Sequence, residues 1–176
     1  LALAAQASEI LVACATGDVV VLSTPDLQEK RRAFVAADLR DIVVQPEGYW
    51  LSLFRSAEIL VLDAKLTVVG KRGLPSQLGK TSKGNFSASF APSVAWRMRA
   101  LPAGGALVVH QRALATQLPA AGAADSPGYG GACPQSSVVQ SVASIVPPVA
   151  PAKPGKALVQ LPLAIDGDVS PDGKWV

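Results

Sequence analysis

The residues best suited to chemistry are the single histidine, His110, and a cysteine that follows it across a long loop, Cys133. A histidine nitrogen and a cysteine sulfur could begin a metal or haem-iron site, but structural zinc usually takes four protein ligands and catalytic zinc three. Asp125 is the only acidic residue near the pair. The residue types of a Ser-His-Asp or Cys-His-Asp arrangement are therefore present, but their spacing gives no evidence for one. A lone histidine is more often structural than catalytic, and this alternative stays open.

Charge is distributed very unevenly along the chain. Residues 64–124 contain eight basic side chains and no acidic one, although the whole chain carries a net charge of only +3. A basic surface favours an acidic protein surface, an anionic polymer or a carboxylate-bearing ligand. The candidates for such a binding face are His110, Arg55, Arg112, Lys80 and Lys83. Aromatic residues make up 5% of the chain and no recognised nucleic-acid motif accompanies the charge, so nucleic acid is a poor candidate partner. The alternative to a binding face is that these basic residues lie in a solvated loop.

A second group of carboxylates lies near the end of the sequence. Asp166, Asp168 and Asp172 suggest calcium, but the segment lacks the bidentate glutamate of an EF-hand loop. We therefore interpret them as residues of Asp-Gly turns.

The elements that must position these residues are β-strands. Of the 176 residues 49% are hydrophobic and 16% charged, which suits one globular domain. The apolar residues fall in short runs bounded by Gly, Pro, Asp and Ser, which predicts strands, and no segment has convincing helical spacing. The longest apolar runs are far shorter than the ~20 residues of a membrane-spanning helix. The expected strands are 10–14, 18–22, 32–35, 41–44, 49–54, 58–62, 66–69, 95–101, 106–110, 137–145 and 157–163.

A repeated turn organises these strands. Pro and Gly recur two residues apart directly before an apolar strand, a spacing typical of a tight turn. The three copies are Pro46 and Gly48, Pro102 and Gly104, and Pro171 and Gly173. In addition, residues 9–23 resemble residues 49–63 at an offset of 40 residues. Repeats of ~40–45 residues with four short strands each are the signature of β-propeller blades.

The repeat predicts an all-β chain with about three four-stranded blades of a larger ring, for which we expect seven blades. Residues 1–39 should be the last strands of one blade and residues 40–72 a complete blade. Residues 73–163 should be a blade with long loop insertions at 73–94 and 112–134, and residues 164–176 the first strand of the next. Without an initiator Met, the sequence has the form of an excerpt from a longer protein.

Turn alternation predicts where the insertions lie. In an up-and-down blade, successive turns alternate between the two faces of the ring. Both insertions should therefore emerge from one face, and the three Pro-containing turns from the opposite face. Long loops in compact domains are usually functional or disordered.

Three segments, 17–22, 52–63 and 169–176, resemble the strands and turns of bacterial YVTN-type propellers, a WD-repeat-like superfamily that includes quinoprotein amine dehydrogenase chains. Residues 55–58 and 109–112 more narrowly resemble secreted propellers joined to cytochrome c or cytochrome c peroxidase-like domains. This resemblance implies a periplasmic or extracellular protein. No haem attachment motif is present in the chain, so haem c would belong to a fused domain or a partner.

Two function classes follow. The first is a binding or scaffold module whose partners are an acidic protein surface, or a fused cytochrome domain, and the remaining blades of the ring. The alternative is a propeller oxidoreductase or hydrolase that uses the loop face around His110 and Cys133. We favour the first, because no set of residues here meets the geometric minimum for catalysis, although the parent protein could still be a haem oxidoreductase. A purely structural role in the cell envelope is a third hypothesis.

Overall fold

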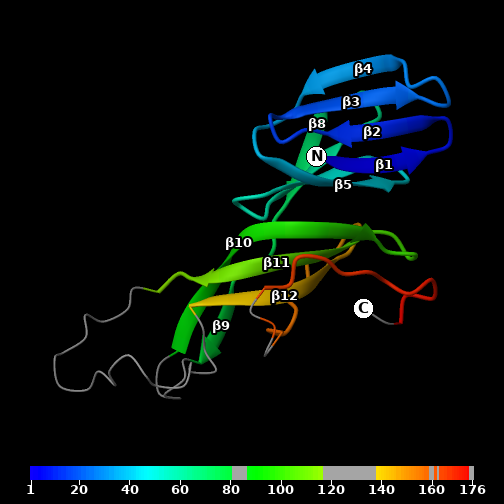
Figure 1. Cartoon of the computed structure of the whole chain (residues 1–176). Helices are drawn as coiled ribbons and strands as arrows, with labels where there is room; N and C mark the ends of the chain where they lie inside the picture. The colour runs from blue at the N-terminus through cyan, green and yellow to red at the C-terminus, as the bar shows by residue number, and fades with distance from the viewer. Residues whose placement is uncertain (81–86, 117–137, 159–160, 162, 175–176) are drawn as a thin grey trace.

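The computed structural model describes residues 1–80, 87–116, 138–158, 161 and 163–174. Within these residues the chain is all-β, with no helix, and its strands form three four-stranded antiparallel sheets (Figure 1). No helix of this part of the chain could therefore span a membrane. The arrangement confirms the all-β class and is consistent with a partial β-propeller.

Each sheet is a meander of consecutive strands. The first sheet consists of β1 (Ala2–Gln6), β2 (Glu9–Ala13), β3 (Asp18–Ser23) and β4 (Glu29–Phe34). The second consists of β5 (Leu39–Gln45), β6 (Gly48–Leu53), β7 (Ile59–Leu62) and β8 (Val68–Arg72). The third consists of β9 (Gln77–Lys80), β10 (Ser87–Ala100), β11 (Ala106–Leu114) and β12 (Val139–Val146).

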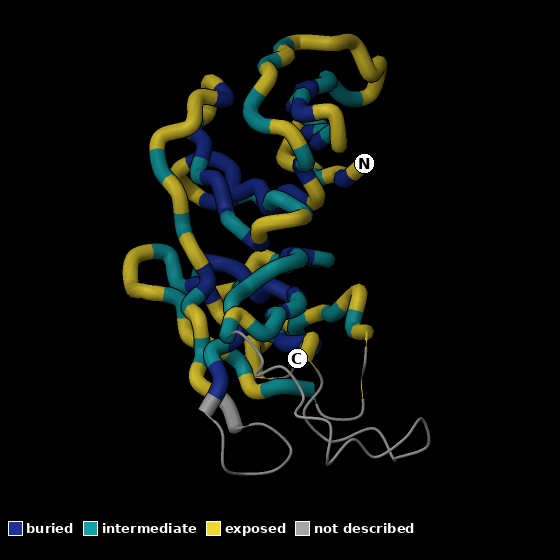
Figure 2. The backbone as a smooth tube through the Cα atoms, turned by 90° about the vertical axis from the view of Figure 1, so that its left-hand side faces the viewer, coloured by how far each residue is buried: buried dark blue, intermediate teal, exposed yellow. Residues whose placement is uncertain are grey.

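The second sheet is buried on both faces because it lies between the other two. Successive side chains of a strand point to opposite faces. Ile42 accordingly packs in the core shared with the first sheet, and Val43 in the core shared with the third. Leu51 and Trp50 divide in the same way, and both are fully buried. Burial on both faces explains why the central strands of this sheet are apolar almost without interruption. Figure 2 shows buried segments inside the sheets and exposed segments at the turns.

The prediction for the first sheet needs correction. Residues 2–6, which we assigned to no strand, form β1 and pair with β2, so the first sheet has four strands rather than the last three of a blade. Ala2 and Ala4 pack into the core shared with the second sheet, and this burial orders a segment whose alanines carry little strand preference.

The third sheet also differs from the prediction. The expected insertion 73–94 contains β9 and the first part of β10, which pair as a hairpin. Among the described residues of the expected strand 157–163, Ala157 makes an isolated bridge to Val142 of β12, and Lys153, which precedes this segment, makes another to Ile145. The prolines of residues 147–154 remove ladder donors and keep this segment from pairing continuously.

The repeat turns lie together at one end of the inner strands. Gln45 beside the first turn donates from Nε2 to the carbonyl of Gly105 (3.0 Å) and accepts that residue's N–H (3.1 Å). The turn at Gly173 lies against Pro102. Gly48 has φ +148°, and a Cβ there would lie 2.0 Å from the Leu62 carbonyl oxygen, so only glycine fits.

The loops after β9 and β11 leave the third sheet at the other end. Ala100 pairs with Ala106 beside the Pro102 turn, whereas Phe90 pairs with Leu114 far from it. In Figure 1 the turn between β10 and β11 accordingly lies on the right, and the arrowhead of β11 points to the left. The described ends of both insertions therefore lie on one face, as turn alternation predicts.

Candidate functional site

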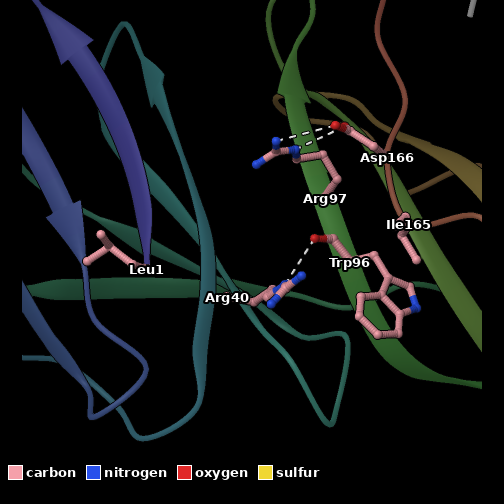
Figure 3. Close-up of a pocket in the computed structure, with 6 residues that line it drawn as sticks. All are labelled: Leu1, Arg40, Trp96, Arg97, Ile165 and Asp166. Carbon is pink, nitrogen blue, oxygen red and sulfur yellow. Dashed lines mark hydrogen bonds and ion pairs between the residues drawn. The ribbon is translucent and has the colours of Figure 1, made fainter.

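A cleft lies where the inner strands of the three sheets come together. β5 contacts both β1 and β10. Between them is a partly open cleft of about 250 Å³, lined by Leu1, Arg40, Trp96, Arg97, Ile165 and Asp166 (Figure 3). These residues are far apart in sequence, so the cleft exists only in the folded arrangement of the sheets.

Four of the lining residues occupy one repeated position. Leu1, Arg40, Trp96 and Ile165 each lie six residues before the residue that opens the following turn. Those turn residues are Ala7, Pro46, Pro102 and Pro171. In a propeller the innermost strands surround a central channel, so equivalent positions of successive blades meet there. The cleft therefore has the position of a channel opening.

Arg40 is the most distinctive side chain of the cleft. Its Nε donates a hydrogen bond to the Trp96 carbonyl oxygen at 3.2 Å. Its guanidinium carbon lies 5.2 Å from the ring centroids of both Phe54 and Trp96, which form an edge-to-face pair. These cation–π contacts orient an exposed guanidinium whose terminal nitrogens have no hydrogen-bond or ion-pair partner among the described residues.

Arg97, on the same strand as Trp96, is instead fully engaged. Its Nε lies 3.0 Å from Asp166 Oδ1, and its Nη1 lies 3.8 Å from Asp41 Oδ2. The hydrogen bond from Arg97 lowers the pKa of the Asp166 carboxyl, and the same bond raises the pKa of Arg97. Both groups thus stay charged near neutral pH, and their charges offset each other at the cleft edge.

Two of the three carboxylates that suggest calcium, Asp166 and Asp168, lie beside arginines. Arg99 Nη2 is 3.5 Å from Asp166 Oδ1, and its Nε is 3.7 Å from Asp168 Oδ1. Asp172 accepts from Ser170 Oγ at 2.7 Å and from the Lys174 N–H within its turn. In the part of the chain that the structure describes, no group of three His, Cys, Asp or Glu side chains could hold a metal ion.

His110 is buried, with 2% of its surface exposed, and does not lie on a binding face. Its Nδ1 is 3.1 Å from the Gln111 carbonyl oxygen and its Nε2 is 2.9 Å from Ser144 Oγ. A carbonyl only accepts, so Nδ1 carries the proton and Ser144 donates to Nε2, while the Gly155 N–H donates to Ser144 Oγ. Burial lowers the pKa of His110. The pair resembles the Ser-His part of a hydrolase site but is enclosed, and its partners make it structural.

The other candidates for the basic face lie in different environments. Arg112 is also buried, and it donates to the side-chain oxygens of Gln140 (2.8 Å) and Gln77 above the Phe90 ring. Burial lowers its pKa. The Arg112 side chain packs against residues of the neighbouring strands rather than facing solvent. This corrects the prediction that Arg112 belongs to an exposed basic face.

Arg55 is highly exposed in the turn between β6 and β7, at the end of the sheets opposite the repeat turns. Its backbone N–H donates to Asp38, and its Nε lies 3.8 Å from Oδ1 of the same carboxylate. The Lys80 side chain, Lys83, Asp125 and Cys133 lie outside the described residues.

Three of the eight basic residues in 64–124, Lys71, Arg97 and Arg99, form ion pairs in the fold. Lys71 lies 3.1 Å from Glu58, and Arg72 donates to the carbonyls of Pro147 and Pro148 while its guanidinium carbon lies 4.8 Å from the Trp50 ring centroid. Lys65 is exposed. A count along the sequence could not show this pairing, because the acidic partners lie outside the segment.

The sequence analysis missed Arg40 and Trp96. The signal that could have found them is their common distance from the repeat turns. Counting back from those turns groups them with Leu1 and Ile165 without any structural information.

We compared the chain with known proteins. No protein-family model and no curated protein matches it. Its fold is similar to a solved chain of hydrazine synthase from Kuenenia stuttgartiensis, with a TM-score of 0.50 and 16% sequence identity. The match covers 98% of this chain and 59% of the hydrazine synthase chain. At this identity the likeness supports the fold alone, and the chain spans little more than half the length of the structure it matches.

Proposed function

We propose that this chain is a β-propeller binding or scaffold module that docks the acidic surface of a c-type cytochrome, either a fused domain or a separate redox partner. The observation that carries the proposal is Arg40, an oriented guanidinium without a carboxylate partner among the described residues, at the opening where the inner strands converge. A rigid scaffold that presents an oriented cation suits recognition of an acidic surface.

The cleft and Arg55 belong to the same end of the sheets. Arg40 lies near the start of β5, and Arg55 follows the end of β6, the strand antiparallel to it. Phe54, next to Arg55, also contacts Arg40. An acidic surface that approaches this end would meet both arginines at once. Their combined potential would accelerate encounter and weaken with added salt.

The haem belongs to the partner in this proposal. The sequence contains no Cys-x-x-Cys-His motif for covalent haem attachment, so this segment supplies the docking surface and not the redox centre. The resemblance of residues 17–22 and 52–63 to YVTN-type propellers supports a periplasmic or extracellular setting. The likeness to a hydrazine synthase chain is in keeping with a role beside an enzyme.

The proposal is tested by calorimetric titration of the 176-residue protein with a c-type cytochrome of acidic surface, at about 20 and 200 mM salt. We expect binding at low salt, and an affinity at least fivefold weaker at high salt. Arg55→Gln should weaken the affinity for the cytochrome further. Lys65→Gln removes one exposed positive charge away from this end and serves as the matched control. Salt-independent binding, or equal effects of the two substitutions, would overturn the proposed docking surface.

A further inference from the structure

We propose that the cleft between the inner strands is a carboxylate-binding site in which Arg40 is the anchoring residue. The inference deepens the proposed function, on which it rests for the setting of the site, by naming the chemical group that the channel opening recognises. Nothing in the fold similarity assigns a ligand to this position.

The first argument is the preorganisation of Arg40. Its Nε is held by the Trp96 carbonyl, and its plane is held near two aromatic rings at equal distances of 5.2 Å. The terminal nitrogens have no hydrogen-bond or ion-pair partner among the described residues, and Figure 3 shows the guanidinium beside Trp96, joined to its oxygen. A fixed guanidinium fork matches the two oxygens of a carboxylate and loses little side-chain freedom on binding.

The second argument is the charge balance of the lining. Arg97 is neutralised by Asp166 on one side and approached by Asp41 on the other. Arg99 is likewise held by Asp166 and Asp168. Among the described side chains that line the cleft, Arg40 therefore supplies the uncompensated positive charge, in a partly enclosed site where charges are screened less than at a flat surface.

The third argument is the size and the wall of the cleft. A volume of about 250 Å³ corresponds to roughly eight water molecules, at about 30 Å³ each. Leu1, Trp96 and Ile165 give this space apolar sides. The arrangement suits a carboxylate on a short aliphatic body. Such a group occurs in a small dicarboxylate and in the side chain of a glutamate that a protein partner inserts.

The test uses succinate and an acetylated, amidated tetraglutamate peptide as probes, and succinamide as the uncharged probe. Each is titrated calorimetrically into the full chain and into Arg40→Gln, Arg40→Lys and Lys65→Gln. We expect saturable binding of at least one carboxylate probe and none of succinamide. Arg40→Gln should weaken it at least tenfold and Arg40→Lys about threefold or more, because lysine keeps the charge but loses the fork. Lys65→Gln should stay within twofold.

The outcomes separate the sources and the proposals. Preference for succinate indicates a free metabolite-sized ligand, and preference for the peptide indicates a protein side chain. The inference is overturned by the absence of saturable binding, or by Arg40→Gln binding like the parent while melting at the same temperature. Salt-sensitive cytochrome binding by the parent chain, together with no saturable binding of either carboxylate probe, would leave the docking function intact and refute only the carboxylate site.

Discussion

Asp41 on β5 accepts the backbone N–H of Met98 on β10 at 2.7 Å, across the boundary between the second and third sheets. Its other oxygen accepts the N–H of Ile42 at 2.9 Å, and only 4% of the residue is exposed. The two inner strands are thereby fixed to each other one residue away from Arg40 and close to Trp96. This buried carboxylate is one of the contacts that set the position of the cleft, together with the Arg40–Trp96 and Gln45–Gly105 hydrogen bonds.

Asp41→Ala should destabilise the chain by about 1–3 kcal/mol, because it leaves the buried Met98 N–H without an acceptor. Asp168→Ala, at an exposed aspartate, should change stability by less than about 1 kcal/mol. Urea unfolding followed by tryptophan fluorescence measures both. Equal stability of the two variants would show that the bond between the sheets contributes nothing.

His110 predicts a pH dependence of stability. Burial lowers the pKa of His110 in the folded state below the ordinary imidazole value of about 6.5, so the unfolded chain binds more protons than the folded chain as pH falls. Stability should therefore be fully present above about pH 6.5 and decrease as pH falls through the folded pKa, with a slope of at most about 1.4 kcal/mol per pH unit.

The measurement is the melting temperature between pH 7.5 and 5. The carboxyls with lowered pKa, among them Asp166, titrate below this pH range. We therefore assign the change in stability within the range to the single histidine. His110→Gln should flatten the profile while lowering stability at pH 7.5, because the Ser144 hydrogen bond changes. An unchanged slope in this variant would rule out His110 as its source.

The sequence predicts the strands and turns of this fold better than its site. The second sheet gives a local signal in its apolar runs, and the turns at Pro46 and Pro102 give one in their Pro and Gly spacing. Residues close together in the sequence determine both features. β1 and β9 carry no such signal. β1 is rich in alanine and β9 reads Gln-Leu-Gly-Lys, and both are ordered by their pairing partners.

The chemistry-bearing residues are less predictable because their environment comes from other sheets. His110 and Arg112 alternate with Gln111 along β11, and nothing in that segment shows that Ser144 and Gln140 will enclose them. Arg40 looks like one more surface arginine until Trp96 is brought beside it. Only the period of the repeat contains that information.

Asp166→Asn should strengthen carboxylate binding in the cleft. Asp166 accepts from Arg97 and lies 3.5 Å from Arg99, so its neutralisation would leave both guanidinium groups with less compensation beside Arg40. We expect the affinity for succinate to rise about three- to tenfold at low salt. Asp172→Asn, which removes a carboxylate in the Gly173 turn, should leave it within twofold. Unchanged or weaker binding in Asp166→Asn would show that the ligand does not sense the charge of the cleft edge.

The outer face of the first sheet predicts self-association. Leu3 is 62% exposed, and it lies in register with the half-buried Val12 and the buried Val20 on the face of the sheet opposite the shared core. In a propeller such a face packs on a neighbouring blade, and an exposed apolar sheet face favours association with another chain. The mass of the 18.1 kDa chain in light scattering should therefore rise with concentration. Leu3→Asp should shift the distribution toward monomer, whereas Leu27→Asp, at an equally exposed turn residue with φ of 55°, should not. A parent chain that stays monomeric over a hundredfold range of concentration would contradict the prediction.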